Sequence, residues 1–307
     1  MATVWTSGCL TAILLPRRDA RMAVFLTGDT HGEMDIAKIE EFARTTKGLT
    51  RDDCLIVLGD FGLLWADPPS KGESWRLDWL ERQPWTTLFL DGNHENFDML
   101  DALPIVERYG GKVQDVRPHV THLMRGEIYS IGGHSFFVCG GAHSIDKEWR
   151  VPHRSWWPQE VPNREERKRI AKAARRVGAV DYVLTHCPPT GQYERYRALY
   201  AGFWGPDDEY TAWLEECVEG AFAYKRWFYG HLHMDLPLDE PHTCLYNQVF
   251  DLDGTGHTFY GTNMGSCSDG EPHEWEQRYC PPPAGKKHGS RAWYACVRCG
   301  KRIPLWG

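Results

Sequence analysis

The chain has 307 residues, of which 42% are hydrophobic and 25% are charged, which suits one large folded domain with a small appendage and excludes wholesale disorder. The net charge of −7 and the pI of about 6.1 exclude a global positive field that would hold a nucleic acid by its phosphates. Ten cysteines are scattered at irregular spacing through a chain too long for a small disulfide scaffold, so we expect reduced thiols and a cytoplasmic protein.

Residues 1–21 are expected to be an extended, poorly ordered start ahead of Met22. The apolar run at residues 10–15 is followed, not preceded, by Arg17 and Arg18, which is the wrong order for a signal peptide. The run is also too short to span a membrane, so we expect no membrane partner.

Short apolar runs that end in polar clusters recur along the chain, and we interpret them as buried strands. The runs are Ala23–Thr27, Cys54–Leu58, Leu88–Leu90, Tyr182–Leu184 and Arg226–Tyr229. Between them, apolar residues at helical spacing predict helices over residues 36–43, 163–177 and 214–221. This alternation predicts an α/β layered fold, in which ligands bind at the carboxyl ends of the strands.

Residues 128–158 interrupt this alternation. Two apolar runs, 128–131 and 135–138, flank Gly132 and Gly133, which is typical of a β-hairpin. The stretch that follows mixes glycine, charge and tryptophan, so we expect a long loop over a site. Further on, the composition shifts to Gly, Pro and charge, which places a domain boundary near residue 265. We therefore expect a main domain over 22–265 and a tail over 266–307.

The polar clusters after the strands contain Asp, His and Asn, each a metal-ligand type. A mixed oxygen and nitrogen set suits first-row divalent metals such as Mn, Fe, Zn, Co or Ni, and the absence of cysteine from these clusters argues against a purely structural zinc. A single histidine after a strand is usually a packed or surface residue, but five such clusters in order indicate a metal site. The candidate ligands are Asp29, His31, Asp60, Asn93, His186, His231 and His233.

The five clusters resemble the motifs of the calcineurin-like metallophosphoesterases, over about residues 22 to 260. The matching motifs are Gly28-Asp29-Thr30-His31-Gly32, Gly59-Asp60, Gly92-Asn93-His94-Glu95, Thr185-His186 and Gly230-His231-Leu232-His233. The resemblance implies a β-sandwich of two sheets flanked by helices (a four-layer αββα fold), with two divalent metal ions at the strand ends. The second motif continues Phe61-Gly62-Leu63 and lacks the arginine of the serine/threonine phosphatases. The chain resembles a bacterial and phage branch of the family more than it resembles the serine/threonine phosphatases.

The resemblance also implies a role for each residue of the metal site. Asp29, His31 and His233 would bind one ion, and Asn93, His186 and His231 the other. Asp60 would bridge both, because a carboxylate has two oxygens. A hydroxide shared by ions roughly 3.5–4 Å apart would attack phosphorus. His94 is assigned to the leaving group, as a proton donor or a stabiliser of charge. Asp91 could orient His94, support the metal ligands from behind, or serve only as a turn residue.

The loop after the hairpin supplies candidate substrate-binding residues. Lys147, Arg150 and His143 could give positive charge to a phosphate, and Trp156 or Trp157 could stack on a base. The alternative is a loop that packs on itself, with ion pairs at its surface.

The tail carries Cys296-Val-Arg-Cys299, which has the form of a zinc knuckle. His273, or alternatively His288, together with Cys280 could complete a structural zinc site, although the first Cys-x-x-Cys half is absent. Such a zinc ribbon could bind nucleic acid or protein, or it could only stabilise the tail. The acidic net charge of the chain disfavours nucleic-acid binding.

The sequence thus predicts a hydrolase of phosphomonoesters or phosphodiesters that acts on a phosphorylated small molecule or a nucleotide. Two alternatives stay open: a nuclease or nucleotide phosphodiesterase, and a zinc-ribbon binding protein on a phosphoesterase scaffold.

Overall fold

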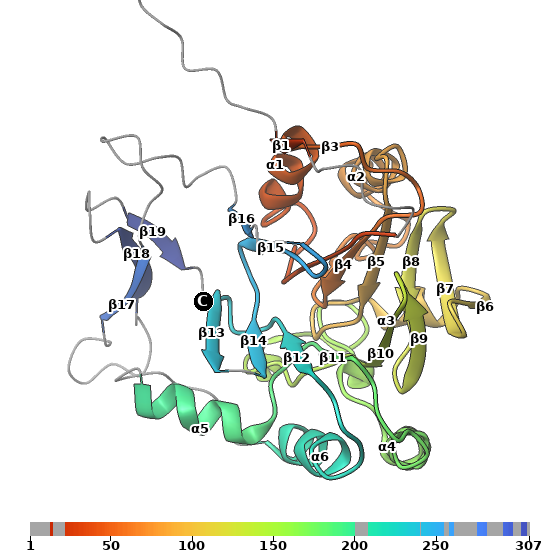
Figure 1. Ribbon diagram of the computed structural model, residues 1–307, viewed down its shortest axis with the longest axis vertical. Helices are drawn as coiled ribbons and strands as arrows, with labels where there is room; N and C mark the ends of the chain where they lie inside the picture. Colours follow the sequence, from red (N-terminus) through yellow and green to blue (C-terminus); the bar gives the residue numbers. More distant parts are fainter. Residues whose placement is uncertain are drawn as a thin grey trace, which may run out of the picture.

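The computed structural model describes residues 22–199, 208–239 and 241–254, and beyond them only short strands at 13–14, 258–260, 275–280, 291–296 and 302–305. Within this part of the chain, two large β-sheets lie face to face with helices on their outer sides (Figure 1). No helix of the described segments is both long and apolar enough to cross a lipid bilayer.

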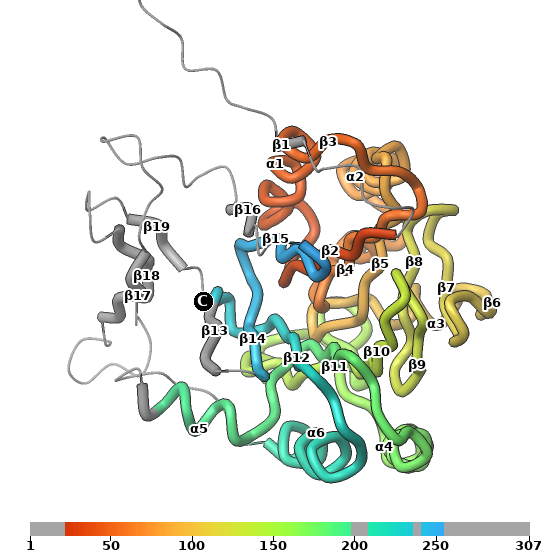
Figure 2. Tube along the Cα trace, in the orientation of Figure 1, coloured from red at the N-terminus to blue at the C-terminus, as the bar shows by residue number. Residues whose placement is uncertain are grey.

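The first sheet has eight strands in the order β16-β15-β2-β4-β5-β8-β7-β6. Strands β2, β4, β5 and β8 run parallel, and the outer strands pair antiparallel. In Figure 2 the late strand β15 lies beside the early strand β2. The strands are β2 (Val24–Thr27), β4 (Cys54–Leu58), β5 (Thr86–Leu90), β6 (Ile105–Arg108), β7 (Gly111–Arg117), β8 (Val120–Leu123), β15 (Gln248–Asp251) and β16 (Thr258–Tyr260).

The second sheet has six strands in the order β13-β14-β12-β11-β10-β9. The hairpin expected around Gly132 and Gly133 is confirmed, because β9 and β10 pair antiparallel. The strands are β9 (Glu127–Ile131), β10 (His134–Cys139), β11 (Tyr182–Thr185), β12 (Arg226–Tyr229), β13 (Leu236–Asp239) and β14 (His242–Cys244).

Two shorter sheets contain the remaining strands of the described residues. One pairs β1 (Ile13–Leu14) with β3 (Thr46–Lys47), and the other joins β17 (Trp275–Cys280), β18 (Arg291–Cys296) and β19 (Arg302–Leu305). The helices are α1 (Ala37–Thr45), α2 (Lys71–Glu81), α3 (Phe97–Asp101), α4 (Arg164–Ala174), α5 (Thr190–Leu199) and α6 (Glu209–Val218), with 3₁₀ turns η1 (Lys147–Trp149) and η2 (Pro158–Glu160).

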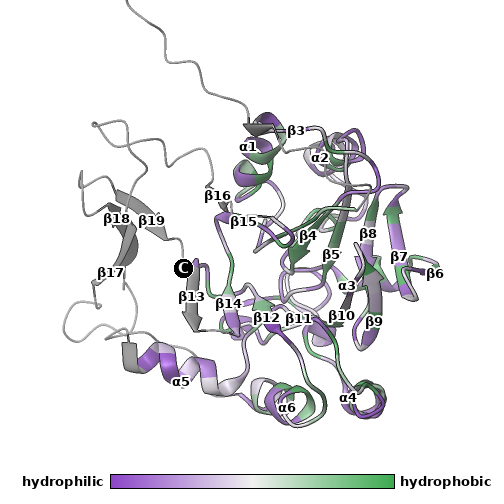
Figure 3. Ribbon diagram, viewed as in Figure 1, coloured by the Kyte–Doolittle hydropathy of each residue, from purple (hydrophilic) through white to green (hydrophobic). Residues whose placement is uncertain are grey.

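Alternating side chains along the central strands build the layers. In β4, Ile56 and Leu58 face the second sheet, while Leu55 and Val57 pack under the helices. Both faces are thus buried, as a parallel sheet between other layers requires. Figure 3 shows the central strands in the green of apolar residues, whereas helices α1 and α4 alternate green with purple. The four-layer αββα architecture expected from the sequence is confirmed.

Helix starts follow their local sequence signals. Asn163 caps α4, accepting hydrogen bonds from the backbone of Glu165 and Glu166, and Glu166 bonds back to the Asn163 N–H. This capping box satisfies backbone donors that would otherwise lack partners. Ser70 and Glu73 do the same at α2, a helix that we did not predict.

Candidate metal centre

The seven candidate ligands come from segments far apart in the sequence but stand directly after strands of the two sheets. Asp29 and His31 follow β2, Asp60 follows β4, and Asn93 follows β5. The remaining three ligands follow β11 and β12 of the second sheet: His186, His231 and His233. Because β2, β4 and β5 are parallel, as are β11 and β12, their carboxyl ends meet at the same edge of each sheet.

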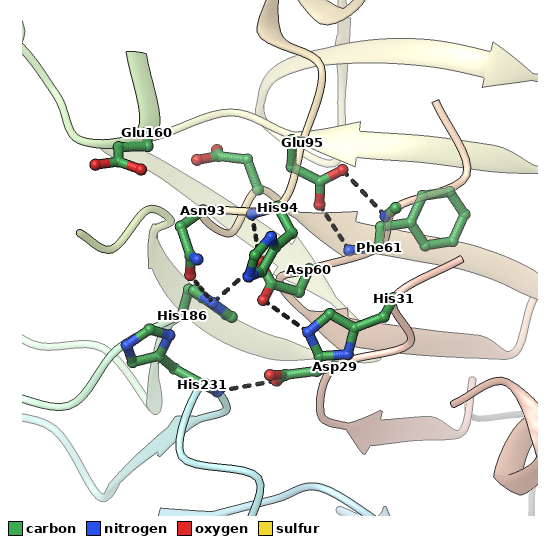
Figure 4. Close-up of polar contacts among 12 residues, drawn as sticks. Asp29, His31, Asp60, Phe61, Asn93, His94, Glu95, Glu160, His186 and His231 are labelled. Atoms are coloured by element: carbon green, nitrogen blue, oxygen red, sulfur yellow. Dashed lines mark hydrogen bonds and ion pairs between the residues drawn. The ribbon is translucent and has the colours of Figure 1, made fainter. Parts of the chain in front are cut away.

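Asp60 lies at the centre of this cluster, with its two oxygens facing different partners (Figure 4). Its Oδ2 lies 3.1 Å from Nε2 of His31, and its Oδ1 lies 3.3 Å from Nε2 of His186. The same Nε2 of His186 lies 3.1 Å from Oδ1 of Asn93, and the ring of His231 packs against His186 at a centroid distance of 4.9 Å. One carboxylate therefore stands between two groups of donors.

The first group is a compact set of oxygen and nitrogen donors. Ligand atoms of Asp29, His31, Asp60 and His233 all lie within 4.8 Å of one another. Asp29 is fully buried, and its Oδ2 makes no hydrogen bond, although Nε2 of His233 lies 3.2 Å away. A buried carboxylate oxygen without a hydrogen bond is costly unless a cation compensates it. The geometry thus fits a divalent metal ion here.

Two of the histidines are oriented as metal ligands usually are. His31 donates its Nδ1–H to Asp35 at 2.7 Å, and His186 donates its Nδ1–H to the Leu58 carbonyl at 2.8 Å. Such a bond to the far nitrogen fixes the ring and leaves Nε2 as the metal-binding atom. In both residues that Nε2 is the atom facing Asp60.

The backbone around the ligands leaves no room for side chains. A Cβ added at Gly92 would lie 2.0 Å from Oδ1 of Asp60, and one added at Gly230 would lie 2.2 Å from Oδ1 of Asp29. Four candidate ligands adopt the left-handed backbone region: His31, Asp60, His231 and His233. Each such residue costs on the order of 1–3 kcal/mol and is typical of a functional site.

Both carboxylates are held in the ionised form. Burial alone would raise the pKa of Asp60, but the charge of His186 and the bonds around it keep that pKa well below its ordinary value. Burial would also raise the pKa of Asp29, but the neighbouring His233 and His186 lower it instead. Both carboxylates are therefore available to a cation as charged oxygen donors.

The histidines differ in how readily they can bind metal. Burial and the neighbouring charge of His186 lower the pKa of His231 to about 3, so this ring is neutral and ready to coordinate. Burial would lower the pKa of His31 too, but the hydrogen bonds to Asp35 and Asp60 raise it to about 10. A cation that binds at His31 must therefore displace a proton.

The structure places the three candidate substrate-binding residues differently. Lys147 is exposed at the start of η1. Arg150 reaches inward, and its Nη1 lies 3.1 Å from Nδ1 of His94. His143 contacts the buried Glu160, with Nδ1 lying 3.5 Å from the carboxylate. Of the three, Arg150 alone contacts a predicted catalytic residue, and the binding of substrate by these residues stays a prediction.

Two of the alternatives that the sequence left open are excluded by the structure. Trp157 does not offer a stacking surface, because it is 1% exposed and its Nε1–H donates to Asp98 at 2.7 Å. Asp91 does not orient His94. Its carboxylate accepts from Nε of Arg125 at 2.7 Å and lies 3.2 Å from Nε2 of His122.

Some supporting residues were missed from the sequence. Ser144 accepts a hydrogen bond from Nδ2 of Asn93 at 3.2 Å, which turns the amide oxygen of Asn93 toward His186. Lys38 is buried and donates to the backbone carbonyls of Asp29 and Tyr246. Asp35 lies four residues after His31, close enough in the sequence to be a candidate partner, whereas Ser144 and Lys38 carry no such signal.

The predicted tail zinc lies outside the part of the chain whose side chains the structure describes. His273 and Cys299 fall in undescribed segments, and only the backbone of Cys280 and Cys296 belongs to described strands. The zinc ribbon and the boundary near residue 265 therefore stay predictions.

A helix-flanked β-sandwich with Asp, His and Asn side chains gathered at its strand ends defines a metal-binding hydrolase. The chain belongs to the calcineurin-like phosphoesterase family, whose model matches residues 22–235. This family hydrolyses phosphoesters with divalent metal ions.

Comparisons with individual proteins add little detail. No curated protein matches the sequence. One solved structure superposes with a TM-score of 0.43 at 11% identity, over 79% of this chain and 100% of that chain. The phosphopantetheinyl hydrolase PptH from Mycobacterium tuberculosis superposes with a TM-score of 0.38 at 16% identity, over 74% of this chain and 89% of that chain. The family assignment rests on the family model and not on these superpositions.

Proposed function

We propose that the protein is a dinuclear metal-dependent phosphoesterase that cleaves phosphomonoester or phosphodiester bonds of a small molecule or nucleotide. The observation that carries the proposal is the placement of Asp60, whose two oxygens face His31 on one side and His186 on the other. A carboxylate in that position can bridge two cations.

In this proposal the ligands form two sets around Asp60. Asp29, His31 and His233 would hold one ion, and Asn93, His186 and His231 would hold the other. Two bound ions would supply an activated water molecule and positive charge for the phosphate.

The remaining residues of the site orient these ligands or contact the substrate. Asp35 and the Leu58 carbonyl fix the rings of His31 and His186, and Ser144 fixes the amide of Asn93. His94 lies beside His31, with a ring-centroid distance of 5.4 Å. From there it can donate a hydrogen bond to an oxygen of the reacting phosphate.

An activity screen tests the proposal. Metal-free protein is reloaded separately with Mn, Fe, Co, Ni or Zn and assayed with p-nitrophenyl phosphate and bis-p-nitrophenyl phosphate. Nucleotides, dinucleoside polyphosphates and phosphopeptides follow with the best metal. We expect hydrolysis with at least one metal and none in the metal-free protein. Absence of hydrolysis with every metal and every substrate would contradict the proposal.

A further inference from the structure

Arg150 is held in place on the loop that follows β10. Its Nε donates to Oδ1 of Asp146 at 2.7 Å, and its Nη1 donates to the Ser155 carbonyl at 3.0 Å. The side chain is 21% exposed, so it is ordered by its contacts rather than extended into solvent. The same Nη1 lies 3.1 Å from Nδ1 of His94, which brings a fixed cation against the residue next to Asn93.

The chemistry of this contact determines which nitrogen of His94 carries the proton. A guanidinium has N–H donors and no acceptor, and it stays charged in proteins. Nδ1 of His94 must therefore accept, and the proton of the neutral ring sits on Nε2. Nε2 lies across the ring from Arg150, so the contact leaves Nε2–H available to a bound phosphate.

We propose that Arg150 is a positioning residue that holds His94 in the Nε2–H tautomer, so that His94 stabilises the transition state as a hydrogen-bond donor. This inference rests on the proposed phosphoesterase function. It differs from the direct phosphate binding that the sequence suggests for Arg150, because Arg150 here acts through His94. No proton leaves His94 in this step: Nε2–H donates to a phosphate oxygen while an oxygen from water bonds to phosphorus and the leaving oxygen departs with the bonding electron pair.

A double-mutant cycle tests whether Arg150 acts on catalysis through His94. We expect Arg150→Ala to lower kcat by about ten- to a hundredfold, the usual cost of losing a residue that orients a functional group, with little change in KM. In a His94→Ala background, Arg150→Ala should cause no further loss, because the group on which it acts is gone. Added guanidinium should restore part of the activity of Arg150→Ala alone.

The control is Arg154→Ala, which removes an exposed arginine of the same loop and should leave kcat unchanged. Circular dichroism and thermal unfolding check that each variant folds. A rise in KM alone, or equal losses in the two His94 backgrounds, would show that Arg150 contacts the substrate directly and would overturn the inference. An inactive wild-type protein would instead overturn the proposed function, so the two failures are distinguishable.

Discussion

Replacing Asp60 by asparagine is expected to lower kcat by about a thousandfold or more, the largest effect on activity that we predict. Asparagine keeps one oxygen to accept the backbone N–H of His94, which lies 2.7 Å from Oδ1 of Asp60. It loses the second oxygen and the negative charge, so the side chain can no longer bridge two cations. The fold should survive, because the retained bond holds the turn after β4.

Steady-state kinetics at saturating metal measure this effect. Asp115→Asn on β7 is the matched control, because it makes the same chemical change in an ion pair with Arg108, away from the site. The control should retain the wild-type kcat. A wild-type kcat in Asp60→Asn would mean that the bridging role belongs to another residue.

Replacing Arg125 by alanine is expected to destabilise the protein by about 3–5 kcal/mol, the largest effect on stability that we predict. Arg125 is buried, forms an ion pair with Asp91, and donates to the Glu160 carbonyl at 3.2 Å. It thereby joins the end of β5, where the ligand-bearing turn begins, to η2. Without it, the charge of Asp91 stays buried with only His122 as a side-chain partner.

Denaturant unfolding measures this loss, and Arg117→Ala is the control. Arg117 pairs with Asp78, but the two side chains are 34% and 55% exposed, so its loss should cost less than about 1 kcal/mol. Adding Asp91→Asn to Arg125→Ala should recover part of the stability, because it removes the uncompensated charge. Equal losses of stability in Arg125→Ala and Arg117→Ala would show that the buried pair stabilises the fold no more than the exposed pair does.

The same pair gives the protein a defined acid dependence. Burial alone would raise the pKa of Asp91, but Arg125 and His122 lower it to about 2. Because the folded-state pKa lies below the unfolded one, the stabilisation is complete above about pH 4 and is lost as the pH falls through 2.

The strands and the candidate metal ligands could be predicted because each candidate follows a run of apolar residues. The run Cys54–Leu58 matches β4 residue for residue, and burial on both faces explains why it shows no polar alternation. Strand β6 was missed because it lies at the edge of the sheet, where Ile105 and Val106 are exposed and two charged residues follow them.

The supporting contacts could not be predicted, because they depend on the path of a loop. Arg150 and His94 are 56 residues apart, and Ser144 lies 51 residues from Asn93. No local pattern links residues at such separations. The sequence suggests Arg150 as a phosphate-binding residue, and only the folded chain shows that it contacts His94.

The central claim, that two cations share Asp60, is tested most directly by titrating metal-free protein with Mn²⁺ under electron paramagnetic resonance. Ions about 3.5–4 Å apart with shared ligands are magnetically coupled. We predict a coupled signal that saturates at about two ions per chain and disappears in Asp60→Asn. A zinc site in the tail would not produce this signal. Uncoupled Mn²⁺ at every stoichiometry, or a coupled signal that survives Asp60→Asn, would contradict the account.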